Sequence, residues 1–138
     1  MTPYLTFAGD CRAALTLYAE AFQSEIRMER TYGDYVPEGV AHPPKDLCDW
    51  ILHAEMEISG TNVWLADEIL APVSPGSMVK LVATAPSAAE GWRVFDALLP
   101  GGRVTLPPTD TFYSTFHAGL VDRFGVHWNI VAEEAPAP

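Results

Sequence analysis

The spacing of apolar residues along the chain predicts a mixture of strands and helices. Within residues 11–22 the apolar side chains recur every three or four positions, which is the period of a helix. Within residues 51–58 they alternate strictly with polar ones, which indicates a strand with one polar face. A second helix is predicted over residues 87–99, where Ser87 and Glu90 form a capping box. The further predicted strands span residues 4–7, 25–32, 63–66, 78–84, 103–106, 113–121 and 128–132.

The order strand, helix, strand, strand, strand occurs twice along the chain. A shift of 77 residues superimposes the two predicted helices, so that Asp10 matches Ser87 as an N-cap and Tyr18 matches Phe95. The match lies in the pattern rather than in residue identity, and it favours an internal duplication. We therefore expect an α+β fold of paired βαβββ modules. The expected parts are one domain over residues 1–138, modules over 1–70 and 78–132, and a frayed tail over 133–138.

Composition and charge narrow the class of protein. Of the 138 residues 49% are hydrophobic and 19% charged, which is typical of a globular chain. The net charge of −10 argues against nucleic acid or an anionic membrane as a partner, because both bind basic surfaces. No apolar run reaches the ~20 residues that span a bilayer. The first residues do not resemble a signal peptide, and two cysteines are too few for a disulfide framework, so we expect a cytoplasmic protein.

Several short motifs are similar to those of a known superfamily. They are the segments 3–9, 53–58, 64–67 and 111–113, and above all residues 122–128, which read Asp-Arg-Phe-Gly-Val-His-Trp. Together with the two βαβββ modules they resemble the vicinal oxygen chelate superfamily, which includes glyoxalase I, bleomycin-resistance proteins and extradiol dioxygenases. Within it the chain is most similar to the PhnB-like branch. The resemblance implies two half-sheets that curl into a cup, and a homodimer that binds a small molecule.

The superfamily's enzymes hold a divalent ion with four His, Gln or Glu ligands, on the first and last strand of each module. Counting from the shared turns places these positions at Pro3, Trp64, Lys80 and Asn129. None of the four offers a carboxylate or an imidazole, and the Lys80 cation would repel a metal ion. We therefore predict no metal ion at these positions and no cofactor, with a divalent metal on other ligands as the alternative.

Two candidate groups could carry chemistry. His53 and Glu55 lie two residues apart on a predicted strand, so both point to the same side. His53 could act as a metal ligand or a general base, with Glu55 setting its tautomer; the alternative is a solvated sheet face. Tyr113, Thr115 and His117 share a face of another predicted strand, where they either contact a polar ligand or simply line the barrel.

The remaining candidates would complete a ligand cup. Leu5, Phe7 and Trp64 are its predicted apolar walls. Asp67 could bind substrate at the mouth of the cup, or it could cap the next turn. Lys80 could bind a substrate carboxylate, or it could pair with a carboxylate of the protein such as Glu55 or Glu57.

Alternation also places His127 on the same face of the last strand as Asn129, with Trp128 in the core. Residues 33–47 contain three prolines and form a loop long enough for a lid. A helix N-terminus lowers the pKa of a thiol, but no catalytic partner lies near Cys11 in the sequence, so we interpret it as a packing residue.

These observations leave three functions open. The first is binding of a small molecule in a metal-free cup, by sequestration or with an unassigned reaction. The second is a metal-dependent lyase or dioxygenase that uses non-standard ligands such as His53, Glu55 and His117. The third is a non-catalytic structural dimer. A methyltransferase is rejected, because no glycine-rich nucleotide loop follows the first strand.

Overall fold

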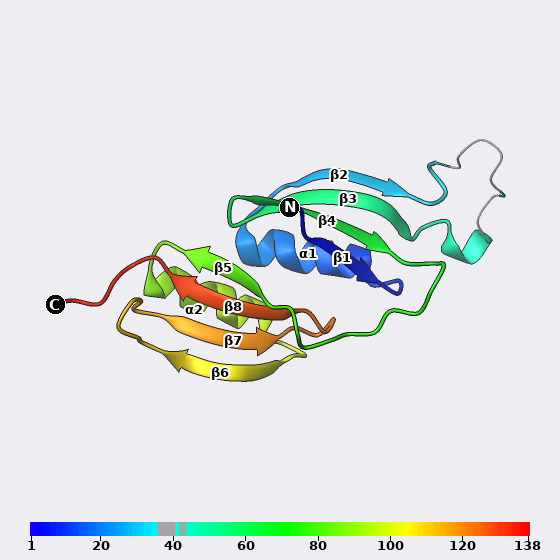
Figure 1. The fold of residues 1–138 in the computed structure, drawn as a ribbon. Helices are drawn as coiled ribbons and strands as arrows, with labels where there is room; N and C mark the ends of the chain where they lie inside the picture. Colours follow the sequence, from blue (N-terminus) through cyan, green and yellow to red (C-terminus); the bar gives the residue numbers. More distant parts are fainter. Residues whose placement is uncertain (36–40, 42–43) are drawn as a thin grey trace. The chain divides into compact units, whose positions relative to one another are not determined.

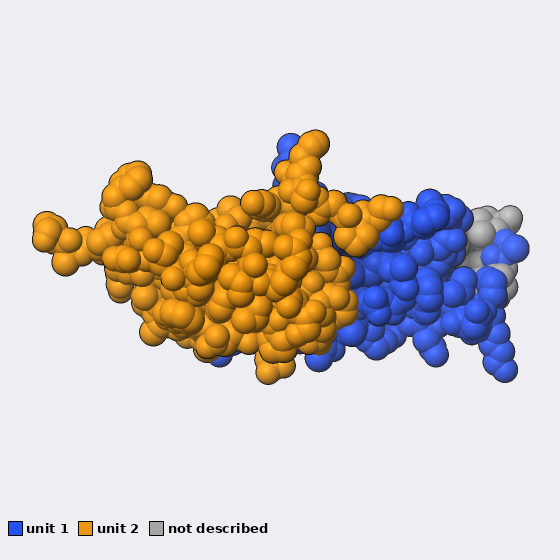
Figure 2. Space-filling model, turned by 90° about the horizontal axis from the view of Figure 1, so that it is seen from below, with its two compact units in different colours: residues 1–19, 23–73 blue, residues 20–22, 74–138 orange. Residues whose placement is uncertain are grey.

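The computed structural model describes residues 1–35, 41 and 44–138. This part of the chain divides into two compact units, which Figure 2 draws in different colours. Unit 1 comprises residues 1–19 and 23–73, and unit 2 comprises residues 20–22 and 74–138. Within the described residues no helix is both long enough and apolar enough to span a membrane.

Unit 1 contains a four-stranded sheet, called sheet A, with a helix against one face (Figure 1). The strand order is β1-β4-β3-β2, with β1 parallel to β4 and the other pairs antiparallel. Its elements are β1 (Tyr4–Phe7), α1 (Cys11–Phe22), β2 (Ile26–Thr31), the short 3-10 helix η1 (Lys45–Leu47), β3 (Ile51–Ile58) and β4 (Thr61–Asp67).

Unit 2 repeats this arrangement in sheet B, whose strand order is β5-β8-β7-β6 (Figure 1). Again the first strand pairs parallel with the last, and the other pairs are antiparallel. Its elements are β5 (Leu81–Ala85), α2 (Ala88–Leu98), β6 (Arg103–Thr109), β7 (His117–Val121) and β8 (His127–Ala132). The predicted α+β fold with two similar modules is therefore confirmed.

Three strand boundaries differ from the predicted ones by three or more residues. β5 begins at Leu81 rather than at residue 78, and β7 begins at His117 rather than at residue 113. β6 continues to Thr109, through two prolines at which the sequence predicts a loop. β6 is an edge strand, and edge strands tolerate proline because one side of the backbone needs no partner.

Each sheet buries one face. In unit 1 the side chains of Ala54, Met56 and Leu65 are fully buried, as are Leu15 and Tyr18 of α1. In sheet B the buried residues of β8 are Trp128, Ile130 and Ala132, and they alternate with half-buried ones. This alternation leaves each sheet a second, more open face that can carry polar side chains.

A buried carboxylate ties unit 1 together. Asp67, which is 1% exposed, ends β4. Its Oδ1 accepts hydrogen bonds from the backbone N–H groups of Gly9 (2.9 Å) and Cys11 (3.0 Å). Its Oδ2 accepts one from Ile51 (2.9 Å). One side chain thus joins the turn before α1, the first residue of α1 and the first residue of β3.

Unit 2 has a buried carboxylate of its own, in the turn between β7 and β8. Oδ1 of Asp122 accepts from the backbone N–H groups of Phe124 (2.9 Å) and Val126 (3.1 Å). Oδ2 accepts from the indole Nε1–H of Trp128 at 3.0 Å. Trp128 is 2% exposed and packs against Phe22, with ring centroids 5.1 Å apart, so its predicted core position is confirmed.

Candidate ligand-binding site

Three of the predicted site residues form a connected group in unit 2. Asn129 lies on β8, on the face opposite the buried Trp128 and Ile130, and we call this face the open face of sheet B. His117 begins β7 and Tyr113 lies in the loop before it. Tyr113 is 46% exposed, so solvent and ligands can reach its ring.

A chain of hydrogen bonds joins the three side chains. The phenol oxygen of Tyr113 lies 2.5 Å from Nδ1 of His117, and Nε2 of His117 lies 3.2 Å from Oδ1 of Asn129. The arrangement is satisfied when the Tyr113 O–H donates to Nδ1 and the His117 Nε2–H donates to the amide oxygen. The amide NH₂ of Asn129 and the lone pairs of the Tyr113 oxygen then remain for a ligand.

A glycine permits close packing of the strands beside this group. A Cβ on Gly119 would lie 2.7 Å from Oγ1 of Thr105 and 3.2 Å from Oδ1 of Asn129. A side chain there would therefore collide with Thr105 and crowd Asn129. The glycine therefore lets Thr105 of β6 and Asn129 of β8 approach the backbone of β7 closely.

The prediction that Thr115 shares this face is wrong. β7 begins only at His117, so the two-residue period of a strand does not extend back to Thr115. The chain bends here because the Ser114 hydroxyl is held between the backbone oxygens of Phe116 and Ala132, each 2.7 Å away. Oγ1 of Thr115 is buried and has no hydrogen-bond partner among the described residues.

His127 and Lys80 lie near the ends of strands in unit 2. His127 begins β8, opposite Val121, and by alternation lies on the same face as Asn129, as predicted. Lys80 precedes β5 and is exposed. The carboxylates expected to pair with Lys80 are engaged in unit 1, where Glu55 contacts His53 and Glu57 pairs with Arg27.

In unit 1 the predicted His53 and Glu55 are close together. Nε2 of His53 lies 3.1 Å from Oε1 of Glu55. The His53 ring also makes edge contacts with Trp64 (centroids 4.9 Å apart) and Tyr4 (6.3 Å). Sequence reasoning missed Tyr4, although its pairing opposite Trp64 on the adjacent strand follows from the register of β1 and β4.

The predicted positions of Leu5 and Phe7 on the ligand face are wrong. Tyr4, not Leu5, stands opposite Trp64, and Leu5 stands opposite the fully buried Leu65. Phe7 is 4% exposed. Both therefore belong to the core face of sheet A, because alternation counted from Pro3 is one residue out of phase with the strand.

Asp67 has a structural role, but it holds the turn before α1 and the start of β3 rather than capping the turn that follows it. Its two carboxylate oxygens accept three backbone hydrogen bonds, and it is 1% exposed. A substrate would have to displace backbone donors to reach it. Asp67 is therefore a structural residue rather than a ligand contact.

The residues at the superfamily's metal positions do not fit a divalent ion. On the open faces the register pairs Tyr4 with Trp64 and Val82 with Asn129, and none of these offers a carboxylate or an imidazole. Pro3 and Lys80 precede their strands and offer none either. Among the described residues no three His, Cys, Asp or Glu side chains converge into a metal site.

Cys11 is not an activated thiol. It is fully buried at the start of α1, which confirms its packing role. Burial raises the pKa of Cys11 well above its ordinary value, and the nearby charges of Asp67 and Glu29 raise it further. These effects outweigh the lowering expected at a helix N-terminus. Residues 36–40 and 42–43 of the predicted lid lie outside the described part of the chain.

Comparison with known proteins places this geometry in context. No family model matches the chain. The protein YjdN of Escherichia coli is 27% identical, and the match covers 97% of each chain. The crystal structure of protein PA1353 from Pseudomonas aeruginosa is 29% identical with a TM-score of 0.82, over 96% of each chain. A PhnB protein from Bacillus cereus, whose description names 3-demethylubiquinone-9 3-methyltransferase, is 25% identical with a TM-score of 0.74, over 96% of this chain and 98% of that one.

More distant structures share the fold alone. The fosfomycin resistance protein FosX from Listeria monocytogenes, in complex with Mn(II), is 10% identical with a TM-score of 0.66, over 97% of this chain and 91% of that one. A glyoxalase-related enzyme from Fulvimarina pelagi is 18% identical with a TM-score of 0.56, over 96% of this chain and 87% of that one. The same architecture thus occurs in a protein that holds a metal ion, whereas the residues at the superfamily's metal positions in this chain do not fit one.

Proposed function

We propose that this PhnB-like member of the vicinal oxygen chelate superfamily binds a small, uncharged, partly aromatic molecule on the open face of sheet B, without a metal ion. The observation that supports this proposal is the hydrogen-bonded chain of Tyr113, His117 and Asn129. It holds three polar groups in fixed positions on the open face of sheet B, where Gly119 lets the neighbouring strands approach closely. Few, well-oriented polar groups beside an aromatic ring are typical of small-molecule sites.

The chemistry of the group favours an uncharged ligand. Tyr113, His117 and Asn129 hydrogen-bond to one another and include no carboxylate, ammonium or guanidinium group, so the group offers a charged ligand no such partner. The amide NH₂ of Asn129 suits a carbonyl oxygen of a ligand. The exposed Tyr113 ring and the 61% exposed side chain of Val82 offer apolar contact.

Benzamide is a suitable probe, because it is flat and uncharged and carries one carbonyl. We expect saturable NMR shift changes at β7 and β8 on titration of the full chain. Tyr113→Ala should weaken binding about tenfold, which corresponds to ~1–2 kcal/mol for a lost ring contact and hydrogen bond. Tyr35→Ala, at a tyrosine of unit 1 that is 59% exposed, is the matched control and should leave the affinity unchanged. If both Tyr113→Ala and His117→Ala leave it unchanged, the proposed site is wrong.

A second candidate function rests on the contact between His53 and Glu55. A metal-dependent lyase or dioxygenase would use these two side chains as non-standard ligands. Elemental analysis of protein purified without added metal distinguishes the two functions. A stoichiometric ion that His53→Ala removes would favour the enzyme, and its absence together with benzamide binding would favour the metal-free site.

We also propose a homodimer, because two open sheets leave edges and apolar surface for a two-fold partner to cover. Light scattering at micromolar concentration should give twice the mass of the 15.1 kDa chain. A dimer that binds neither metal nor small molecule would favour the third function, a structural one.

A further inference from the structure

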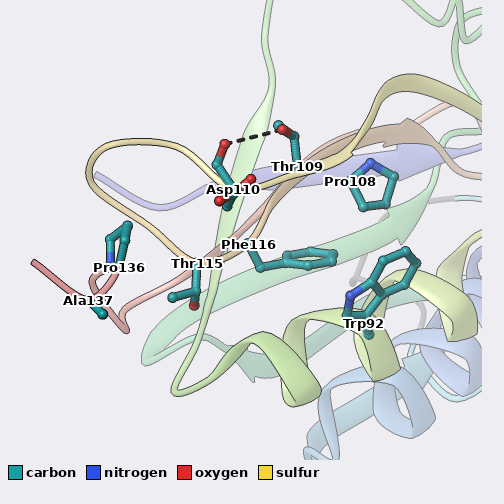
Figure 3. Close-up of a pocket in the computed structure, with 8 residues that line it drawn as sticks. All are labelled: Trp92, Pro108, Thr109, Asp110, Thr115, Phe116, Pro136 and Ala137. Carbon is teal, nitrogen blue, oxygen red and sulfur yellow. Dashed lines mark hydrogen bonds between the residues drawn. The ribbon is translucent and has the colours of Figure 1, made fainter.

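A groove of about 560 Å³ lies in unit 2, apart from the Tyr113–His117–Asn129 group (Figure 3). Trp92 of α2 stands at one end, and Pro136 and Ala137 of the C-terminal segment stand at the other. The remaining lining residues are Pro108, Thr109, Asp110, Thr115 and Phe116. The volume suits a small organic molecule.

The apolar end of the groove is the indole of Trp92, which two neighbouring rings hold in place. Trp92 is 48% exposed, although it packs edge-on against Phe95 and Phe116, with centroids 5.9 and 5.3 Å apart. These contacts fix the ring without covering it. The residue that matches Trp92 in unit 1 is Leu15, which is 1% exposed, so packing of the helix does not by itself require a tryptophan here.

The polar side of the groove carries negative charge only. Among the described residues that line it, Asp110 alone is charged, and its carboxylate has no hydrogen-bond or ion-pair partner within the described part of the chain. The Thr109 hydroxyl donates to the backbone oxygen of Asp110, which holds the residue in place (3.2 Å). The carboxylate oxygens of Asp110 are suitable acceptors for an ammonium N–H.

We infer that this groove is a second binding site, which takes a small organic cation with a flat apolar body. An aromatic face and an unpaired carboxylate together recognise a cation, because the ring quadrupole and the carboxylate charge both attract it. None of the described lining residues is basic, and the chain carries a net charge of −10, so an anion is disfavoured. The flat walls of Trp92 and Pro108 accommodate the apolar body.

The test compares two probes of nearly equal shape, 1-naphthylmethylamine, which is protonated at pH 7, and the neutral 1-naphthylmethanol. Calorimetric titration of the full chain should show the amine binding at least tenfold more tightly. Asp110→Asn should reduce the affinity for the amine to that for the alcohol. Trp92→Leu should weaken the binding of both probes at least fivefold. Circular dichroism confirms that each variant is folded.

Two matched control variants separate the groove from general surface charge and from the site of the proposed function. Asp96→Asn removes the same charge from an exposed position on α2 outside the groove, and it should leave the amine affinity within twofold. Asn129→Ala alters the group of the proposed function and should also leave the amine affinity unchanged. The test of the groove is therefore independent of the test of the proposed function. Equal affinity for amine and alcohol, or equal losses in Asp110→Asn and Asp96→Asn, would overturn the inference.

Discussion

The two units share a topology, but the buried aspartate of each unit holds its own unit together in a different way. Asp67 of unit 1 accepts from Gly9 and Cys11, which lie 58 and 56 residues away in the sequence. Asp122 of unit 2 accepts from groups two, four and six residues away. The same chemical group therefore joins distant segments in one unit and stabilises a local turn in the other. A duplicated fold can keep its strand order while the polar contacts that hold it change.

The largest effect should come from removing these carboxylates. Asp67→Ala leaves three backbone N–H groups of three segments without an acceptor, and we expect a loss of about 3–5 kcal/mol. Asp122→Ala should cost less, about 2–3 kcal/mol, because two of its three partners are backbone N–H groups of one local turn, although the buried Trp128 Nε1–H also loses its acceptor. Urea denaturation measures both. Equal losses would contradict the difference drawn between the units.

The next effect tests how each helix meets its sheet. At matching positions α1 has Ala14 and α2 has Gly91, where a Cβ would lie 2.6 Å from Cδ1 of Phe116. We expect Gly91→Ala to destabilise by about 1–3 kcal/mol through overpacking. Adding Phe116→Leu should recover part of that loss, and a thermal melt of the double variant checks it. If Gly91→Ala raises the melting temperature, the close approach is not rigid.

A smaller effect should come from Cys11 of unit 1, which makes the stability of the protein depend on pH. The pKa of the Cys11 thiol is raised in the folded chain. Above the unfolded pKa near 9 the thiol ionises in the unfolded chain but not in the folded one, so the stability that Cys11 contributes at lower pH is lost as the pH rises. Between pH 8 and pH 10 we expect stability to fall by about 1 kcal/mol. Cys11→Ala should flatten this dependence in urea melts across that range. An unchanged slope would assign the effect to another group.

The smallest effect concerns the starts of the helices. Ser87 accepts from the backbone N–H of Glu90 at 3.3 Å, a long hydrogen bond, so Ser87→Ala should cost about 0.5–1 kcal/mol. Asp10→Ala should cost less than about 0.5 kcal/mol, because Asp67 already accepts from the first amide of α1. Thermal melts compare the two. A loss for Asp10→Ala as large as that for Ser87→Ala would show that the two caps are equivalent.

The sequence predicts the strand order of both modules and the two helices, because their apolar periods are long and regular. The faces of short strands are harder to predict. β1 has four residues, so an error of one position exchanges Leu5 with Tyr4 and moves Phe7 to the wrong side. Strand alternation misplaces Thr115 because a serine hydroxyl, and not a breaker residue, bends the chain before β7.

The candidate site is predictable only in part. Tyr113 and His117 come together because they are four residues apart across that bend, although strand alternation does not hold there. Periodicity does not reveal the groove beside Trp92, because its walls come from a helix, a strand end, a loop and the C-terminal segment. The sequence signal is an aromatic residue at a helix position where the other module has a buried leucine.

Pro107 and Pro108 on β6 have a consequence for self-association. β6 is the outer strand of sheet B, and its pairing with β7 is irregular between Leu106 and Thr109, where the two prolines lack N–H donors. A strand from another molecule that approached this edge would meet missing donors and a rigid, kinked backbone. The part of the edge at these two prolines is therefore unsuited to cross-β extension, which disfavours aggregation through it.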